Sequence, residues 1–167
     1  MTRPKILAPA GDKNSFLAAV AAGADSIYCG LKIFSARMEA ANFSVDELSR
    51  LTRLAAAHNI DVYLAINSTI KESEINKIFK ILCKITRYTD LKGLIIQDPA
   101  LVRLARQAGF SLDLHLSTLG NCTGAAAVKA ASDMGFKKVV LPREFNIDEM
   151  KAVAEDIPET TELEVFI

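Results

Sequence analysis

Short apolar runs alternate with longer amphipathic segments along the whole chain. The apolar runs are nearly continuous in Ile, Leu and Val, which is typical of parallel strands that are buried on both faces. Strands are therefore predicted at Lys5–Ala8, Ser26–Cys29, Val62–Ile66, Gly93–Ile96, Leu112–Leu116, Lys138–Leu141 and Glu162–Ile167.

Helix start signals lie between these runs. Ser44 with Glu47, and Asn146 with Glu149, have the spacing of capping boxes. Apolar residues between Ile75 and Ile85 recur on one helical face. Helices are therefore predicted from about 12 to 22, 44 to 58 and 73 to 88, and from about 98, 121 and 146 onward.

This alternation predicts an α/β fold, and we expect a TIM-like (β/α) barrel. The strand starts are about 26 residues apart, close to the roughly 30 residues of one barrel unit. We expect a single domain over residues 1–167 that holds the N-terminal six and a half βα units and is truncated within the seventh strand. A doubly wound open parallel sheet is the alternative. Polar residues after every complete strand favour the barrel, and so does the lack of a Gly-rich dinucleotide motif after the first strand.

The composition excludes a disordered tail and argues against a strongly basic nucleic-acid coat protein. Of the 167 residues, 50% are hydrophobic and 24% are charged, and 20 basic residues balance 20 acidic ones. No apolar run approaches the roughly 20 residues of a membrane helix, and no signal peptide is recognisable. We therefore expect a cytoplasmic protein with no membrane partner. The three cysteines form neither a disulfide framework nor a metal motif, so no metal site is predicted.

Candidate binding residues follow the predicted strands, where a barrel has its open mouth. The longest connection carries Arg37, whose guanidinium could hold a carboxylate or a phosphate through two hydrogen bonds. Arg37 could instead pin the loop, and Asp12 and Asp98 could be helix N-caps. The predicted substrate-binding residues are Gly11, Asp12, Arg37, Asn42, Asn67, Gln97, Asp98, Ser117 and Thr118.

Three residues, His115, Arg143 and Glu144, are candidates for catalysis. His115 lies within the fifth strand, where an inward-facing imidazole could act as a general acid or base; it could also be a core residue. Arg143 and Glu144 follow the sixth strand and could act on a substrate or form an ion pair at the rim. Cys122, His115 and Asp98 could also form a catalytic Cys–His–Asp system, although their spacing in the sequence does not demand one.

The third predicted helix carries a basic stripe at spacings of three and four. Its members are Lys77, Lys80, Lys84 and Arg87. Such a stripe is typical of the solvated outer face of a barrel helix, and contact with an RNA backbone is the alternative interpretation.

The strand-end motifs keep one order along essentially the whole chain. They are Leu7–Asp12, Ala22–Gly30, Phe34–Phe43, Val62–Asn67, Ile96–Pro99, His115–Thr118, Val139–Glu144 and Glu162–Ile167. In this order they resemble peptidase family U32, the collagenase-like proteases of unassigned catalytic type. One departure is Leu119-Gly120, where relatives usually have glutamine followed by a small or apolar residue.

The resemblance implies a TIM-like barrel followed by a His-Gly-Ala-x-Cys segment and further cysteines, which bind an iron–sulfur cluster in some relatives. No cofactor is expected in this chain itself, and a redox or cluster role for Cys29 or Cys122 stays open. Other relatives resemble oxygen-independent hydroxylation factors that act on transfer RNA, ribosomal RNA or ubiquinone.

From these observations we expect the N-terminal barrel portion of a U32 protein, with a pocket for an anionic small molecule, a peptide or a nucleic-acid base. The alternatives are a portion of an RNA or quinone hydroxylation factor and a non-catalytic RNA-binding module. Whether the chain is an enzyme stays open, and by itself it is expected to be inactive. The unpaired strand edges of an incomplete barrel predict self-association.

Overall fold

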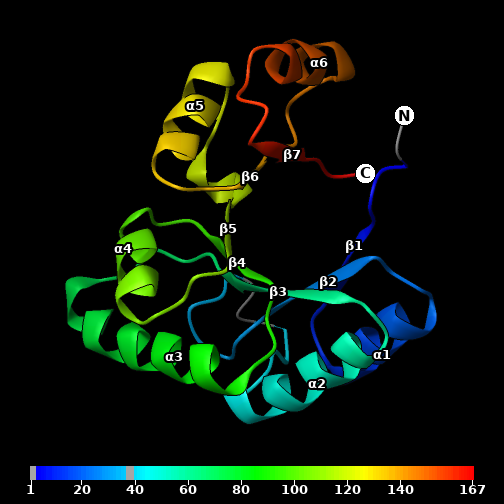
Figure 1. Ribbon diagram of the computed structural model, residues 1–167, viewed down its shortest axis with the longest axis vertical. Coiled ribbons are helices and arrows are strands. Elements are labelled where there is room, and N and C mark those ends of the chain that lie inside the picture. Colours follow the sequence, from blue (N-terminus) through cyan, green and yellow to red (C-terminus); the bar gives the residue numbers. More distant parts are fainter. Residues whose placement is uncertain (1–2, 37–39) are drawn as a thin grey trace.

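The computed structural model describes residues 3–36 and 40–167. Its strands form one parallel sheet in which each strand pairs with its neighbours in the sequence. The strands are β1 (Leu7–Ala10), β2 (Ser26–Gly30), β3 (Asp61–Ile66), β4 (Gly93–Ile96), β5 (Asp113–Leu116), β6 (Lys138–Val140) and β7 (Glu162–Glu164). The sheet is curled, and β1 and β7 are its two edges (Figure 1).

The helices follow one another around the outside of the curled sheet (Figure 1). They are α1 (Lys13–Ala21), α2 (Val45–Ala57), α3 (Ile75–Tyr88), α4 (Ala100–Gln107), α5 (Ala125–Asp133) and α6 (Ile147–Glu155), with the short 3₁₀ helices η1 (Glu72–Glu74) and η2 (Thr118–Gly120). Within the described ranges, no helix has the length and apolar content needed to cross a membrane.

The strand order confirms the predicted incomplete TIM-like barrel. β1 and β7 lie at opposite ends of the strand order and do not pair with each other (Figure 1). The doubly wound alternative is wrong, because the strand order of such a sheet reverses at a switch point, whereas here it runs from β1 to β7 without a reversal.

The two largest differences from the predicted strand boundaries are in the first and the last strand. The first strand is Leu7–Ala10 instead of Lys5–Ala8, so it includes Pro9. Proline is tolerated there because β1 is an edge strand that pairs on one side only. The last strand pairs only over Glu162–Glu164, and the residues after it lie outside the ladder.

The helix start signals are confirmed at α1, α2 and α6, which begin with capping boxes. At α1 the Asp12 Oδ1 accepts a hydrogen bond of 2.8 Å from the Ser15 N–H. The predicted start of α5 near Asn121 is too early. Asn121 ends η2 with a positive φ of 52°, and α5 begins at Ala125.

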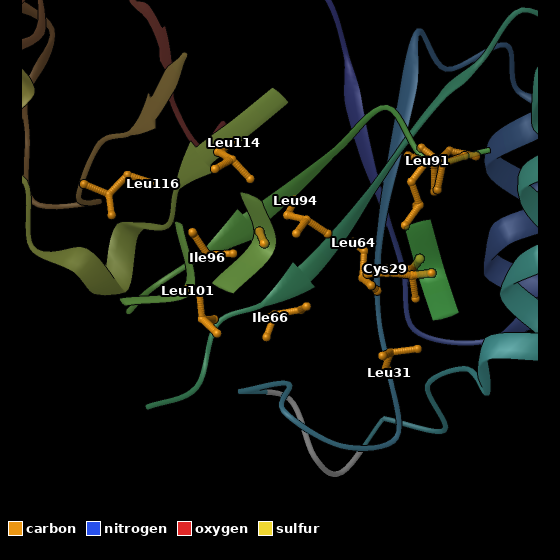
Figure 2. Packing of buried hydrophobic residues seen from close by; sticks show 14 of the residues in the cluster. Cys29, Leu31, Leu64, Ile66, Leu91, Leu94, Ile96, Leu101, Leu114 and Leu116 are labelled. Carbon is orange, nitrogen blue, oxygen red and sulfur yellow. The ribbon is translucent and has the colours of Figure 1, made fainter. Parts of the chain in front are cut away.

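Successive residues of each strand face opposite sides of the sheet, and this alternation produces two apolar layers. The outer layer lies between the sheet and the helices and contains most of the buried side chains. Figure 2 shows part of it, with Leu64, Leu94 and Ile96 on neighbouring strands. The inner layer is smaller and is formed by Tyr63, Ala65 and Ile95, against which Leu7 and Tyr28 pack. The inner layer forms the floor beneath the candidate site.

Candidate functional site

A cavity of about 420 Å³ lies at the carboxyl ends of the strands. This is the end at which barrel enzymes bind their substrates, and the volume lies in the range of small-molecule sites. We call it the mouth cavity. Its lining comes from β1 to β7 and the connections after them, including Ala65 and Ile95 of the inner layer.

The connection from β2 to α2 is held against this cavity by backbone hydrogen bonds. The Asn42 N–H donates to the Gly11 carbonyl at 2.8 Å, and the Phe43 N–H donates to the Gly30 carbonyl at 3.0 Å. The Asn67 side chain, which follows β3, accepts a hydrogen bond of 3.0 Å from the Ala36 N–H. Asn67 therefore ties this connection to the neighbouring strand end and positions its residues over the cavity.

Gly30 permits the close approach of this connection. A Cβ atom at Gly30 would lie 2.6 Å from the Ser35 Oγ and 3.0 Å from the Asn42 Oδ1. Replacing Gly30 by alanine is therefore expected to lower the free energy of unfolding by about 1–3 kcal/mol, because the connection must shift. Urea unfolding measures this loss. Gly11→Ala in the same cavity is the matched control, since its Cβ would be 3.4 Å from the nearest atom. Equal losses in the two variants would contradict the steric explanation.

The structure brings together several of the residues that the sequence singled out. Gly11, Asn42, Asn67, Ser117, Thr118, Arg143 and Glu144 line the mouth cavity. They come from connections far apart in the chain, and their proximity results from the curling of the sheet. Their roles in binding or catalysis remain predictions.

Four predicted residues do not line the mouth cavity as described. Asp12 is an exposed helix cap, and the Asp98 Oδ1 accepts a hydrogen bond of 3.0 Å from the Ala100 N–H at the start of α4. The placement of Asp12 agrees with the N-cap interpretation, whereas the N-cap of α4 is Pro99 and Asp98 precedes it. Gln97 and His115 are also absent from the lining. A fifth, Arg37, lies outside the described residues.

His115 lies inside the barrel below the mouth cavity. It pairs in register with Ile95, its side chain is 1% exposed, and its ring centroid is 4.5 Å from that of Tyr63. Burial, followed by the charge of Lys138, lowers the pKa of His115 to about 4. Its Nδ1 is buried with no hydrogen-bond partner. The imidazole is therefore neutral near pH 7 and fits the core interpretation better than that of a general base in contact with a substrate.

Arg143 and Glu144 are exposed at the rim of the mouth cavity. The Arg143 guanidinium lies over the Phe166 ring at 4.3 Å from its centroid. An ion pair between Arg143 and Glu144 is not among the contacts of the described residues. Arg143 instead forms a cation–π contact with Phe166, and both residues line the cavity.

The lining residues that the sequence interpretation did not name as candidates include Tyr28, Ser35, Glu164 and Phe166. Glu164 is the most informative of them. Burial raises the pKa of its carboxyl, against the opposing charge of Lys138, whose Nζ is 4.0 Å away. Alternate residues of a strand share a face, so the spacing of Glu162, Glu164 and Phe166 could have indicated an inward row.

The cysteines are not arranged as nucleophiles or as a cluster site. Burial raises the pKa of Cys29 to about 12 and also raises the pKa of Cys122. Cys122 precedes α5 and is not in its first turn. Cys83 is exposed on α3. Among residues 3–36 and 40–167, no group of three His, Cys, Asp or Glu side chains could hold a metal ion. The residues present therefore do not form a site for an iron–sulfur cluster.

The sequence profile of Peptidase family U32 matches residues 11–167. With this match over most of the chain, on a TIM-like barrel whose mouth carries the predicted motifs, the chain belongs to Peptidase family U32.

Proteins similar to this chain are named either as proteases or as RNA hydroxylation proteins. An uncharacterized protease of Methanocaldococcus jannaschii is 31% identical over 100% of this chain and 41% of its own length. A tRNA hydroxylation protein of Haemophilus influenzae is 32% identical over 99% of this chain and 35% of its own length. A 23S rRNA 5-hydroxycytidine synthase of Escherichia coli is 28% identical over 96% of this chain and 24% of its own length. The chain thus spans less than half the length of these relatives.

Solved structures agree with the fold. The structure of a U32 peptidase superposes with a TM-score of 0.78 at 13% identity, over 99% of this chain and 69% of that one. A phosphonopyruvate hydrolase superposes with a TM-score of 0.66 at 15% identity, over 98% of this chain and 67% of that one. At these identities the likeness concerns the fold alone.

Proposed function

We propose that this chain is the substrate-binding barrel portion of a U32 protein that modifies RNA, and that its mouth cavity binds a nucleobase. The observation that carries the proposal is the chemistry of the cavity lining. Its polar groups suit the recognition of a planar heterocycle, whereas the described residues place no activated nucleophile there.

Three groups could have served as a nucleophile or its base, and no hydrogen bond joins any two of them among the described residues. The Ser117 Oγ accepts a hydrogen bond of 3.3 Å from the Leu119 N–H and caps η2. The pKa of the Cys29 thiol is raised to about 12. Burial lowers the pKa of His115 to about 4, which makes its imidazole a weak base, and His115 does not line the cavity. A serine or cysteine hydrolase needs its nucleophile within hydrogen-bond reach of a base.

The remaining lining groups are those that bind bases in RNA-binding proteins. Single-stranded bases are recognised by stacking on aromatic rings or guanidinium planes and by hydrogen bonds to their edges. Arg143 and Phe166 offer the stacking surfaces, and the Asn67 and Thr118 side chains can bond to a base edge. The names of the relatives from Haemophilus influenzae and Escherichia coli support the same choice.

Binding of free nucleosides tests this proposal. Cytidine or uridine, titrated into the chain by calorimetry, is expected to bind with one-to-one stoichiometry. Arg143→Ala is expected to raise the Kd about tenfold or more, because stacking of a base contributes about 1–3 kcal/mol. Arg103→Ala, which removes an exposed arginine of α4, is the matched control and is expected to bind as the unchanged chain does. Nucleoside binding that is indifferent to Arg143 would contradict the proposal.

A peptidase is the second candidate, and Glu164 favours it. A carboxyl group whose pKa is raised by burial can act as a general base or acid on a water molecule or a leaving group. The name of a collagenase of Porphyromonas gingivalis, 30% identical over 92% of this chain and 36% of its own length, supports this candidate. A peptide of Gly-Pro-Ala repeats that binds in the mouth cavity while nucleosides do not would favour it over the RNA proposal.

A further inference from the structure

A second cavity, of about 510 Å³, lies beside the mouth cavity. We call it the outer groove. It is lined by α1, α2 and the connection after β2, and Asn42 lines both the groove and the mouth cavity. Gly11 lines the mouth cavity and its neighbour Asp12 lines the outer groove, so the two cavities adjoin where the Asn42 N–H donates to the Gly11 carbonyl. A chain-like ligand with one unit in the mouth cavity can therefore continue into the outer groove beside Asn42.

Three cations line the outer groove: Lys13 at the start of α1, Lys32 after β2 and Arg50 on α2. Lys13 and Arg50 form no ion pair with any other described residue, and Lys32 has only a long contact of 3.7 Å with Glu47. All three side chains are exposed. Their charges are thus available to an anionic ligand.

The two carboxylates of the outer groove are already engaged in helix capping. Asp12 accepts hydrogen bonds from the N–H and hydroxyl of Ser15, and Glu47 accepts them from the N–H and hydroxyl of Ser44. These bonds hold the two carboxylates at the N-terminal ends of α1 and α2. The positive ends of the two helix dipoles there offset the negative charge of the carboxylates. The three cations outnumber the two carboxylates of the groove, and Lys32 and Arg50 also help to lower the pKa of Glu47.

The apolar part of the groove is formed by Leu17 of α1 and Leu54 of α2, each 37% exposed. A surface that combines exposed aliphatic side chains with separated cations matches a nucleic-acid strand, whose sugars and base faces are apolar and whose phosphates are regularly charged. We propose that the outer groove binds the phosphodiester backbone of single-stranded RNA on one side of the base held in the mouth cavity. This inference rests on the proposed function.

The test compares the affinity of the chain for a nucleoside with its affinity for single-stranded RNA. A single-stranded RNA hexamer with a central cytidine is expected to bind more tightly than cytidine. The triple variant Lys13→Ala/Lys32→Ala/Arg50→Ala is expected to raise the Kd of the hexamer at least tenfold and to leave that of cytidine unchanged. Three lost phosphate contacts would also lower the slope of log K against log salt concentration by about 2, from roughly 0.7 per contact on single strands.

The matched control is the triple variant Lys80→Ala/Lys84→Ala/Arg87→Ala, which removes the same charge from α3. The inference is overturned if this variant weakens the hexamer as much as the groove variant, if the groove variant binds the hexamer normally, or if the groove binds a peptide or a second copy of the chain instead. If cytidine does not bind but the groove variant still weakens the hexamer, the proposed function fails and the groove assignment stands.

Discussion

Replacing Leu94 by alanine is expected to lower the free energy of unfolding by about 2–5 kcal/mol. Leu94 lies on β4 near the middle of the sheet, and its side chain is fully buried in the outer layer. Strands on both sides hold β4 in place, so the surrounding side chains can fill the resulting cavity only in part. Urea unfolding followed by circular dichroism measures the loss.

The control for this prediction is Ile147→Ala on α6. The Ile147 side chain is 69% exposed, and its truncation is expected to change the free energy of unfolding by no more than about 0.5 kcal/mol. If the two variants lose similar stability, the outer layer between sheet and helices is not the main source of stability, and the barrel assignment of these residues is wrong.

Acid is expected to destabilise the protein through His115. The pKa of this side chain is about 4 in the folded protein, against 6.5 for an ordinary histidine, because burial and the charge of Lys138 disfavour the imidazolium form. As the pH falls, His115 is therefore protonated at a higher pH in the unfolded chain than in the folded protein. The stability that the neutral ring contributes is complete above pH 6.5 and is lost as the pH falls towards 4. The full loss is ~3 kcal/mol.

The His115→Leu variant isolates this effect. Carboxylates whose pKa is lowered by capping hydrogen bonds, such as Asp12 and Glu47, also destabilise the protein in acid. They do so in both proteins, so the difference between the two stability profiles from pH 7 to pH 4 reports His115. His58→Gln, at an exposed helix end, is the control and is expected to follow the unchanged chain. The prediction is refuted if the stability of His115→Leu falls with pH in parallel with that of the unchanged chain.

Part of the mouth cavity could be predicted because some of its residues come directly after strands. Asn67 follows β3 and Ser117 follows β5, and the carboxyl ends of parallel strands meet at one end of a barrel. Glu164 and Tyr28 were missed for the opposite reason. They lie within strands, where an inward residue differs from an outward one only once the face of the strand is known.

Asp12 shows a further limit of the sequence. A carboxylate that follows a strand and precedes a helix is consistent both with a cap and with a ligand group, since the two patterns are the same along the chain. Only the hydrogen bonds to Ser15 decide that Asp12 caps α1. Asp12 also lines the outer groove.

By itself, the sequence determined the order and type of the elements and the family, because apolar runs and caps are local patterns. The tertiary structure decided which strand residues face the interior, which connection closes over the mouth cavity, and where the cations gather. These depend on the curl and register of the sheet, which bring Asn42 to Gly11 and Ile95 to His115. No local pattern encodes such contacts, because each joins segments that are separate in the chain and meet only when neighbouring strands pair.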